Sequence, residues 1–240
     1  MACVDVALLP DHVDIDALET QCVIVIDVLR ASTTMIAAVE SGAESIQPIA
    51  DVQDARDVAQ NNPEVLLCGE RHGVPPDGFV IGNSPLEYEP SVVAGKRLVL
   101  TTTNGTRALS MVGHAKKILI GGLTNRASAC IELGSQDVLI VCAGTEGRVS
   151  LDDSFTAGMM VQWLTQQAGY DATETAQIAC QSAEWLLLKH RSCEQVLKST
   201  LYGRRLIDLG MDRDIEYAAQ LDSSEAVPVL DLPSNTITAG

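Results

Sequence analysis

Acidic side chains stand where apolar segments of this chain end. Asp27 closes the most hydrophobic run, Glu70 follows another, and Asp152 and Asp153 come after the last one. Carboxylates suit Mg²⁺, which takes one or two of them together with waters and substrate phosphate oxygens. We expect at least two of these acids to bind Mg²⁺ and one to act as a general base. Two alternatives are open: Asp27 pairs with Arg30 to close a loop, and the acidic pair caps the following helix.

The densest polar loop runs from Thr101 to Thr106, after the apolar run 97–100 and before a helical stretch. In such a junction, backbone N–H groups and the positive end of a helix dipole point at one spot and form an anion cradle. Phosphate or a similar oxyanion is therefore the first ligand to expect there. The alternative is a threonine-rich strand end in which Asn104 is an ordinary helix N-cap.

Arginine recurs at the same edge of the expected sheet. Five of the eleven arginines lie in loops that follow expected strands, namely Arg30, Arg71, Arg107, Arg126 and Arg148. A guanidinium offers a planar fork of donors to phosphate, sulfonate or carboxylate oxygens, so converging arginines indicate a ligand with more than one anionic group. Arg107 and Arg126 fall in a first helical turn, where the alternative is that they face solvent.

Apolar runs alternate with helical stretches through residues 1–150. Strands are expected at 4–9, 22–28, 45–49, 65–68, 98–101, 118–120 and 138–141, and helices at 33–40, 51–60, 105–112 and 125–133. This alternation indicates right-handed crossovers and a largely parallel sheet with helices on both faces. We predict a three-layer α/β/α fold, in which ligands collect outside the carboxyl ends of the strands.

The last third of the chain is helix-rich. Helices are expected at 155–168, 173–189 and 212–221, with one strand-like run at 227–230. Because no linker sets this part off, residues 1–240 are expected to form a single α/β domain. Within it, residues 1–150 alternate strand and helix, residues 151–232 complete the domain, and residues 233–240 are a frayed tail.

Composition limits the class of protein. The chain is 46% hydrophobic but only 3% aromatic, so its core must be aliphatic. The formal net charge of −16 argues against nucleic acid or an anionic membrane as a partner, although a small anionic ligand is still compatible with it. We expect no membrane span, no targeting segment and reduced cysteines, which together indicate a cytoplasmic protein. A homodimer is the oligomer to test at this size.

Four motifs resemble the 2-phosphosulfolactate phosphatase family, in order along the chain. They are Asp27 to Thr34, Gly69 to Arg71, Gly82 to Pro85 and Thr101 to Thr106, and Cys142 to Gly144, Asp152-Asp153 and Ala157-Gly158 extend the likeness. The resemblance covers nearly the whole chain. It implies a cytosolic, Mg²⁺-dependent hydrolysis of the phosphate ester of a sulfonated lactate, a step in coenzyme M biosynthesis, on a three-layer α/β/α fold.

The resemblance also implies an enzyme unrelated to the aspartyl-phosphate phosphatases. The run from Asp27 to Arg30 agrees, because it lacks a second Asp two residues after the first. The implied substrate carries phosphate, sulfonate and carboxylate on three carbons. Several guanidinium groups would be needed to bind it.

Site residues follow from this resemblance together with the loops. The expected catalytic residues are Asp27, Arg30 and Glu70. The expected substrate-binding residues are Ser32, Thr33, Arg71, Asn83, Ser84, Thr102, Thr103, Asn104, Gly105, Thr106 and Arg126. Phosphate is expected on the 102–106 loop, with the sulfonate or carboxylate near Arg71. Asn83 and Ser84 would close over the ligand, unless their loop is simply a turn in which Pro85 starts a helix.

Two other functions remain open. One is a non-catalytic anion-binding or regulatory protein, which would need the arginines and amides but not the acids. The other is a phosphohydrolase of the same family that acts on a different phosphorylated acid. Asp27 and Glu70 discriminate the binding protein from the enzymes, because only hydrolysis requires acids and a metal.

Overall fold

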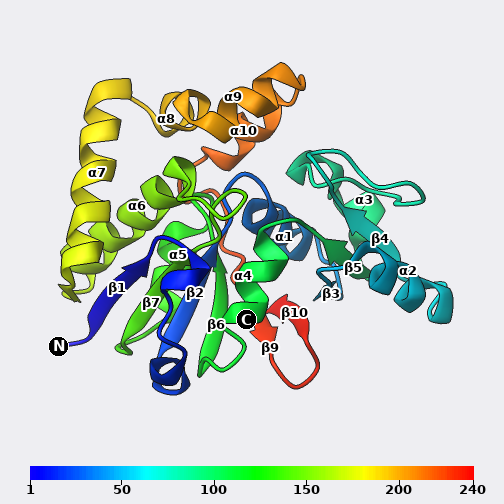
Figure 1. The fold of residues 1–240 in the computed structure, drawn as a ribbon, viewed down its shortest axis with the longest axis horizontal. Helices are drawn as coiled ribbons and strands as arrows, with labels where there is room; N and C mark the ends of the chain where they lie inside the picture. Colours follow the sequence, from blue (N-terminus) through cyan, green and yellow to red (C-terminus); the bar gives the residue numbers. More distant parts are fainter.

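A ten-stranded, largely parallel sheet organises the protein in a computed structural model, which describes residues 1–240 (Figure 1). The strands are β1 (Cys3–Ala7), β2 (Cys22–Ile26), β3 (Ser45–Pro48), β4 (Leu66–Gly69), β5 (Arg97–Thr101), β6 (Lys117–Gly121), β7 (Val138–Cys142), β8 (Asp171–Ala172), β9 (Pro228–Asp231) and β10 (Thr236–Ala239). Their order across the sheet is β4-β5-β3-β10-β9-β6-β2-β7-β1-β8. The predicted α/β class is confirmed.

Helices connect and cover these strands. They are α1 (Ala31–Glu40), α2 (Val52–Asn61), α3 (Pro90–Val93), α4 (Gly105–Met111), α5 (Arg126–Glu132), α6 (Leu151–Gln167), α7 (Glu174–His190), α8 (Cys193–Ser199), α9 (Leu201–Asp208) and α10 (Asp212–Ala218). Short 3-10 helices form at Pro10–His12, Ile15–Thr20 and Pro85–Glu87. The expected helices all occur, with shifted ends. The sequence reasoning did not predict α3, α8 or α9.

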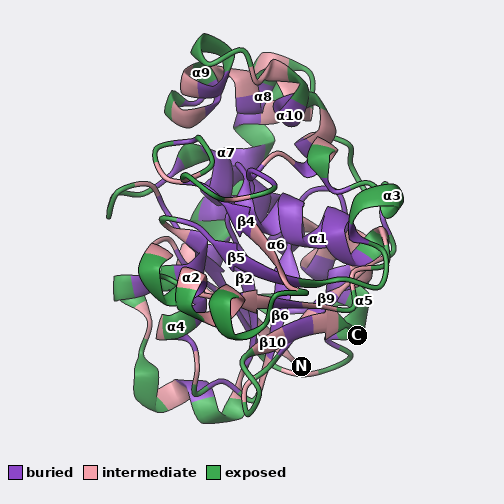
Figure 2. Cartoon of the chain, turned by 90° about the vertical axis from the view of Figure 1, so that its right-hand side faces the viewer, coloured by how far each residue is buried: buried purple, intermediate pink, exposed green.

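Alternate side chains of β2 lie in two different cores. Cys22, Ile24 and Ile26 belong to one buried cluster, and Val23 and Val25 belong to another. Because side chains alternate across a strand, the sheet separates the two cores. Residues of α6 and α7 cover the first face, and residues of α1 and α4 cover the second. Figure 2 shows buried residues concentrated in the strands and on the helices against them, so the predicted three layers are confirmed.

The C-terminal hairpin joins two parallel blocks of the sheet. β4, β5 and β3 form one block, and β6, β2, β7, β1 and β8 form the other. Between them, β9 pairs antiparallel with β6, and β10 pairs antiparallel with β9 and β3. The frayed tail expected at 233–240 is therefore wrong. Ile237 is fully buried opposite Ile46. The three consecutive β-branched residues Thr236, Ile237 and Thr238 favour a strand here.

Helices α8, α9 and α10 pack together above the carboxyl ends of the parallel strands (Figure 1). They place the last third of the chain over the edge where the sequence reasoning expected a ligand. No helix in the structure combines the length and the apolar character needed to cross a membrane.

Candidate active site

Four carboxylates gather at the carboxyl edge of the parallel sheet. Asp27 follows β2, Glu70 follows β4, and Asp152 and Asp153 lie in the first turn of α6, after β7. All four residues are buried. Burial raises the pKa of Asp27 to about 7, and the charges of Glu70 and Asp152 add to the rise. The structure thus brings the predicted acids together in one electrostatically coupled cluster.

The Asp27 carboxylate lies next to the first turns of α1 and α4. Its Oδ1 accepts a hydrogen bond from the backbone amide of Ala31 at 3.4 Å. A β-carbon built at Gly105 would lie 3.0 Å from Oδ2. Only glycine lets the backbone come this close without displacing the carboxylate.

The hydroxyls of Ser32 and Thr33, which were expected to bind substrate, lie in the first turn of α1 and contact the loop that carries Asp27. Ser32 Oγ accepts from the backbone amide of Asp27 at 3.2 Å. Thr33 Oγ1 donates to the carbonyl oxygen of Val28 at 2.8 Å. Both residues are fully buried, so their contacts fix the backbone that positions the acid.

Asp153 ties two strand-end loops together. Its Oδ1 accepts from the amide of Val28 at 2.9 Å, and its Oδ2 accepts from the amide of Gly144 at 3.0 Å. Burial raises the pKa of Asp153 well above its ordinary value, and the neighbouring Asp152 and Asp27 add to the rise. Both carboxylate oxygens of Asp153 are therefore already used by the protein.

Asp152 keeps a freer carboxylate than Asp153. Its Oδ1 accepts from Oγ of Ser150 at 2.5 Å, and no hydrogen bond reaches its Oδ2. Burial raises the pKa of Asp152. The alternative that one of the two acids caps the helix is wrong, because Ser150 is the N-cap of α6 and accepts from the amide of Asp153.

Glu70 holds the threonine-rich loop in place. Its Oε1 accepts from the amide and the hydroxyl of Thr103, at 2.9 and 3.0 Å, and its Oε2 accepts from the amide of Gly73 at 2.7 Å. A carboxylate of the protein therefore occupies part of the predicted anion cradle. The rest of that loop is braced internally, since the Thr106 amide donates to Thr102 Oγ1 at 3.2 Å.

Asn104 stands at the N-cap position of α4 without capping it. Its side chain makes no capping hydrogen bond to the helix. Instead its Oδ1 accepts from the amide of Glu146, in the loop between β7 and α6, at 3.3 Å. The alternative of an ordinary N-cap is therefore wrong, and Asn104 links two walls of the site.

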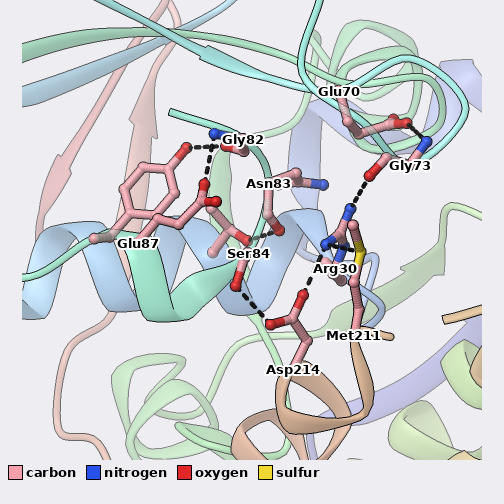
Figure 3. A network of polar contacts seen from close by, with 11 residues as sticks. Arg30, Glu70, Gly73, Gly82, Asn83, Ser84, Glu87, Met211 and Asp214 are labelled. Carbon is pink, nitrogen blue, oxygen red and sulfur yellow. Dashed lines mark hydrogen bonds and ion pairs between the residues drawn. The ribbon is translucent and has the colours of Figure 1, made fainter. Parts of the chain in front are cut away.

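Arg30 lies at the centre of a buried polar network that reaches into α10 (Figure 3). Its Nη1 forms an ion pair with Oδ2 of Asp214 at 2.7 Å, and its Nη2 donates to the carbonyl oxygen of Gly73 at 2.8 Å. Ser84 Oγ donates to Oδ1 of the same Asp214 at 2.5 Å. Arg30 therefore binds Asp214 rather than Asp27. It connects the loop after β4 with the C-terminal helices.

Two buried polar atoms in this region have no hydrogen-bond partner in the protein, Nε of Arg30 and Oδ1 of Asn83. Buried polar groups without a partner are uncommon in folded proteins. The backbone around them is well held, because the carbonyl of Asn83 accepts from Thr34 Oγ1 at 2.9 Å. Pro85 does begin a helix, but only the single 3-10 turn Pro85–Glu87.

Three of the other arginines predicted at this edge are bound by the protein. Arg71 donates to the carbonyl oxygens of Glu70 and Ala50. Arg107 forms an exposed ion pair with Asp11, and Arg126 forms a partly buried ion pair with Asp222. Arg148 alone among the five has no ion-pair partner and no side-chain hydrogen bond.

A cavity of about 770 Å³ opens between the β7–α6 loop and α9. Asp152 and Ser150 line it from one side, and Tyr202, Arg204 and Arg205 line it from the other. Burial raises the pKa of Tyr202 to about 12, and the charges of Glu70 and Asp27 add to the rise, so this phenol lies near the acid cluster.

The sequence reasoning missed the residues that α9 and α10 bring to this edge. These are Tyr202, Arg204, Arg205 and Asp214. A signal for α9 was present, since Thr200 is its N-cap and Gly210 follows its end with a positive φ of 74°.

Comparison with known proteins agrees with this architecture. The sequence model of the family described as 2-phosphosulpholactate phosphatase matches residues 7–232. The chain belongs to the 2-phosphosulpholactate phosphatase family. A Deinococcus radiodurans protein named "Probable 2-phosphosulfolactate phosphatase" is 37% identical over 223 residues, which is 90% of each chain. A Thermotoga maritima protein of the same name is 36% identical over 228 residues, which is 95% of each chain.

In this member of the 2-phosphosulpholactate phosphatase family, the four motifs that carried the resemblance converge in space. Residues of the Asp27 to Thr34 motif contact residues of the Gly82 to Pro85 motif through Thr34 and Asn83. Glu70 contacts the threonine-rich motif through Thr103. The motifs are therefore parts of one site at the carboxyl edge of the sheet.

The carboxylates would supply only part of the ligand set of a Mg²⁺ ion. No three His, Cys, Asp or Glu side chains are arranged to hold a metal ion by themselves. Among the four acids, Glu70 and Asp153 have both oxygens bound by protein donors, whereas Asp152 has a free oxygen. The cluster also has no Arg or Lys salt-bridged to it. An ion completed by water and substrate oxygens suits this donor set.

Proposed function

We propose that this protein is a Mg²⁺-dependent phosphoric monoester hydrolase that converts 2-phosphosulfolactate to sulfolactate and phosphate. Membership of the 2-phosphosulpholactate phosphatase family supports the reaction class and the substrate. The observation that carries the proposal is the buried acid cluster around Asp27, at the sheet edge where open α/β folds bind ligands. A protein that only bound anions would have no use for repelling carboxylates in this position.

Asp27 is the proposed proton acceptor. Hydrolysis requires a water to attack phosphorus, the ester P–O bond to break, and the proton of the water to be taken up. A pKa of about 7 for Asp27, caused by burial and by its acidic neighbours, suits a group that both takes and releases a proton near neutral pH. Ala31 donates its amide to this carboxylate, and the backbone of Gly105 packs against it.

Asp152 is the residue that would hold Mg²⁺, through the oxygen that no protein donor uses. When bound, Mg²⁺ would polarise the phosphoryl group as a Lewis acid. Glu70 and Asp153 have a positioning role in this proposal, because each fixes loop backbone around the site. Glu70 keeps the 102–106 loop beside Asp27, where it forms the proposed phosphate-contacting wall.

Arg30 is likewise a positioning residue in the proposed enzyme. Both of its terminal nitrogens bind the protein, and its contacts with Gly73 and Asp214 keep the loop after β4 against α10. Asn83 and Ser84 are held by the same network. Their side chains would define the wall of the substrate site next to Arg30.

Phosphate release from 2-phosphosulfolactate and from a panel of phosphorylated hydroxy acids tests the proposal. Each substrate is assayed with Mg²⁺ and with a chelator in its place. We expect release that requires Mg²⁺ and is fastest with 2-phosphosulfolactate. No release from any substrate with Mg²⁺ present would remove the enzyme proposal, and unchanged release in chelator would remove the metal. A faster reaction with another acid would keep the hydrolase and replace the substrate.

A further inference from the structure

Two arginines beside the acid cluster have no partner in the protein. Arg148 lies in the β7–α6 loop and Arg204 lies on α9, and neither forms an ion pair or a side-chain hydrogen bond. Both line the cavity of about 770 Å³. Both arginines are exposed, as are other cations of the chain, but these two line one cavity and form a local positive patch in a chain with a formal net charge of −16.

Two other charged residues of the cavity lining, Arg205 and Glu146, pair with each other. Arg205 forms an ion pair with Glu146 at 3.5 Å, and its Nη2 donates to the carbonyl oxygen of His72 at 3.4 Å. This pair bridges the β7–α6 loop and α9, the two segments that carry Arg148 and Arg204. Arg148 and Arg204 therefore lie on the two segments that this pair connects.

The cavity borders the reaction centre proposed above at Asp152. Asp152, the proposed Mg²⁺ ligand, is part of its lining, and so is Tyr202, which lies close enough to Asp27 and Glu70 for their charges to raise its pKa. Of the four acids only Asp152 lines the cavity, so a small molecule whose phosphate lies beside Asp152 would reach the cavity with its other end. The arginines would meet the end of the molecule that does not react.

We propose that Arg148 and Arg204 bind an anionic group of the substrate other than the phosphate. The substrate class is a short phosphoester with a second anionic group, either a sulfonate or a carboxylate, and this assignment rests on the proposed function. Guanidinium forks from two walls match the several oxygens of such a group. Arg71, where the sequence reasoning placed this group, is bound by backbone carbonyls instead.

Steady-state kinetics of Arg148→Gln and Arg204→Gln test the proposal. The substrates are 2-phosphosulfolactate, 2-phospholactate, which lacks the sulfonate, and the phosphate ester of 2-hydroxyethanesulfonate, which lacks the carboxylate. Arg97→Gln is the charge-matched control, because Arg97 is exposed at the opposite end of β5. We expect KM for 2-phosphosulfolactate to rise about tenfold or more in each cavity variant, with kcat changing less, and to stay unchanged in the control.

The shortened substrates identify the group that the arginines bind. For the shortened substrate that lacks that group, the cavity variants should have the same KM as the wild type. An unchanged KM for 2-phosphosulfolactate in both variants would overturn the inference, and so would an equal rise with both shortened substrates, since that would place the arginines at the phosphate.

Calorimetric binding of sulfolactate separates this inference from the proposed function. One outcome is that the wild-type protein hydrolyses none of the substrates but binds sulfolactate, and that Arg148→Gln and Arg204→Gln each weaken this binding about tenfold. The anion site would then stand while the hydrolase proposal falls. If the wild-type protein hydrolyses 2-phosphosulfolactate and both variants bind sulfolactate normally, the hydrolase stands and the anion site falls.

Discussion

The backbone of Gly105 packs against the carboxylate of Asp27, at a distance that leaves no room for a side chain. A β-carbon at position 105 would lie 3.0 Å from Oδ2 of Asp27 and 2.8 Å from Cβ of Ala31. The first turn of α4 and the first turn of α1 are therefore in direct contact around the proposed proton acceptor. This contact explains why position 105 of the threonine-rich loop is a glycine.

Gly105→Ala should displace Asp27 and lower the rate of phosphate release about tenfold or more. Overpacking at this contact should also cost about 1–3 kcal/mol of stability in urea unfolding. Gly113→Ala is the matched control, because its new β-carbon would lie 3.4 Å from the carbonyl oxygen of Ser110, an ordinary contact. Equal activities for the two variants would show that the position of Asp27 does not matter.

Asp27→Asn should lower turnover by about 100-fold or more while leaving the protein folded, since the amide cannot take up the proton of the attacking water. The variant should still gain thermal stability with Mg²⁺, because Asp152 is the proposed ligand. Phosphate release and a thermal shift titration measure the two effects separately. Near-normal turnover would exclude Asp27 as the proton acceptor.

Stability should depend on pH through Asp27 in chelator-treated protein. The pKa of the Asp27 carboxyl is about 7 in the folded state and about 4 in the unfolded state. The folded state binds more protons between these values, so the free energy of unfolding should fall as pH rises, by up to about 4 kcal/mol from this group. Its contribution is fully present below about pH 4 and lost above about pH 7.

Urea unfolding of wild type and Asp27→Asn across this pH range measures the contribution as a difference. The variant cannot ionise at position 27, so its free energy of unfolding should not show the fall with pH that Asp27 causes. Relative to their values at pH 4, the variant should therefore be more stable than the wild type at pH 8. Parallel curves for the two proteins would mean that Asp27 is ionised throughout the range.

Asp152 and Asp153 are neighbours in sequence, yet their variants should behave differently. Asp152→Asn should abolish the thermal shift caused by Mg²⁺ with little effect on the metal-free protein. Asp153→Asn should cost about 1–3 kcal/mol without metal, because one of two buried backbone amides, at Val28 or Gly144, loses its acceptor. Thermal unfolding of both variants with and without Mg²⁺ distinguishes the roles, and a lost shift in Asp153→Asn alone would reverse them.

Local patterns predicted much of the fold. The uninterrupted Val and Ile run of β2 indicates a strand buried on both faces, and Asp51 marks the start of α2 as its N-cap. The gathering of Asp27, Glu70 and Asp152 follows from strand-end topology alone, because parallel strands place their carboxyl ends at one edge.

Partners far apart in sequence could not be predicted in the same way. Arg30 and Asp214 are 184 positions apart, and nothing near either residue indicates the other. Arginine frequency at strand ends suggested five ligand-binding groups, but only the tertiary structure shows that Arg107 and Arg126 pair with aspartates of the chain. β9 was predicted as a strand-like run at 227–230, whereas β10 was missed, because its pairing joins two blocks of the sheet that are distant in sequence.

Removing the buried partner of Arg30 should destabilise the protein strongly. The side chains of Arg30 and Asp214 are only 2% and 4% exposed, so Asp214→Ala leaves a buried guanidinium without its counter-ion, at a cost of about 3–5 kcal/mol. Asp11→Ala is the matched control, since its ion pair with Arg107 is exposed and should contribute less than about 1 kcal/mol.

The double variant Arg30→Met, Asp214→Leu tests whether the charge itself is the cause. Replacing both partners by apolar side chains removes the uncompensated charge, so urea unfolding should show most of the lost stability restored. Activity should stay low, because Gly73 and Ser84 lose the contacts that hold their loop against α10. A double variant that regained both stability and activity would show that the network supports the fold but does not position the site.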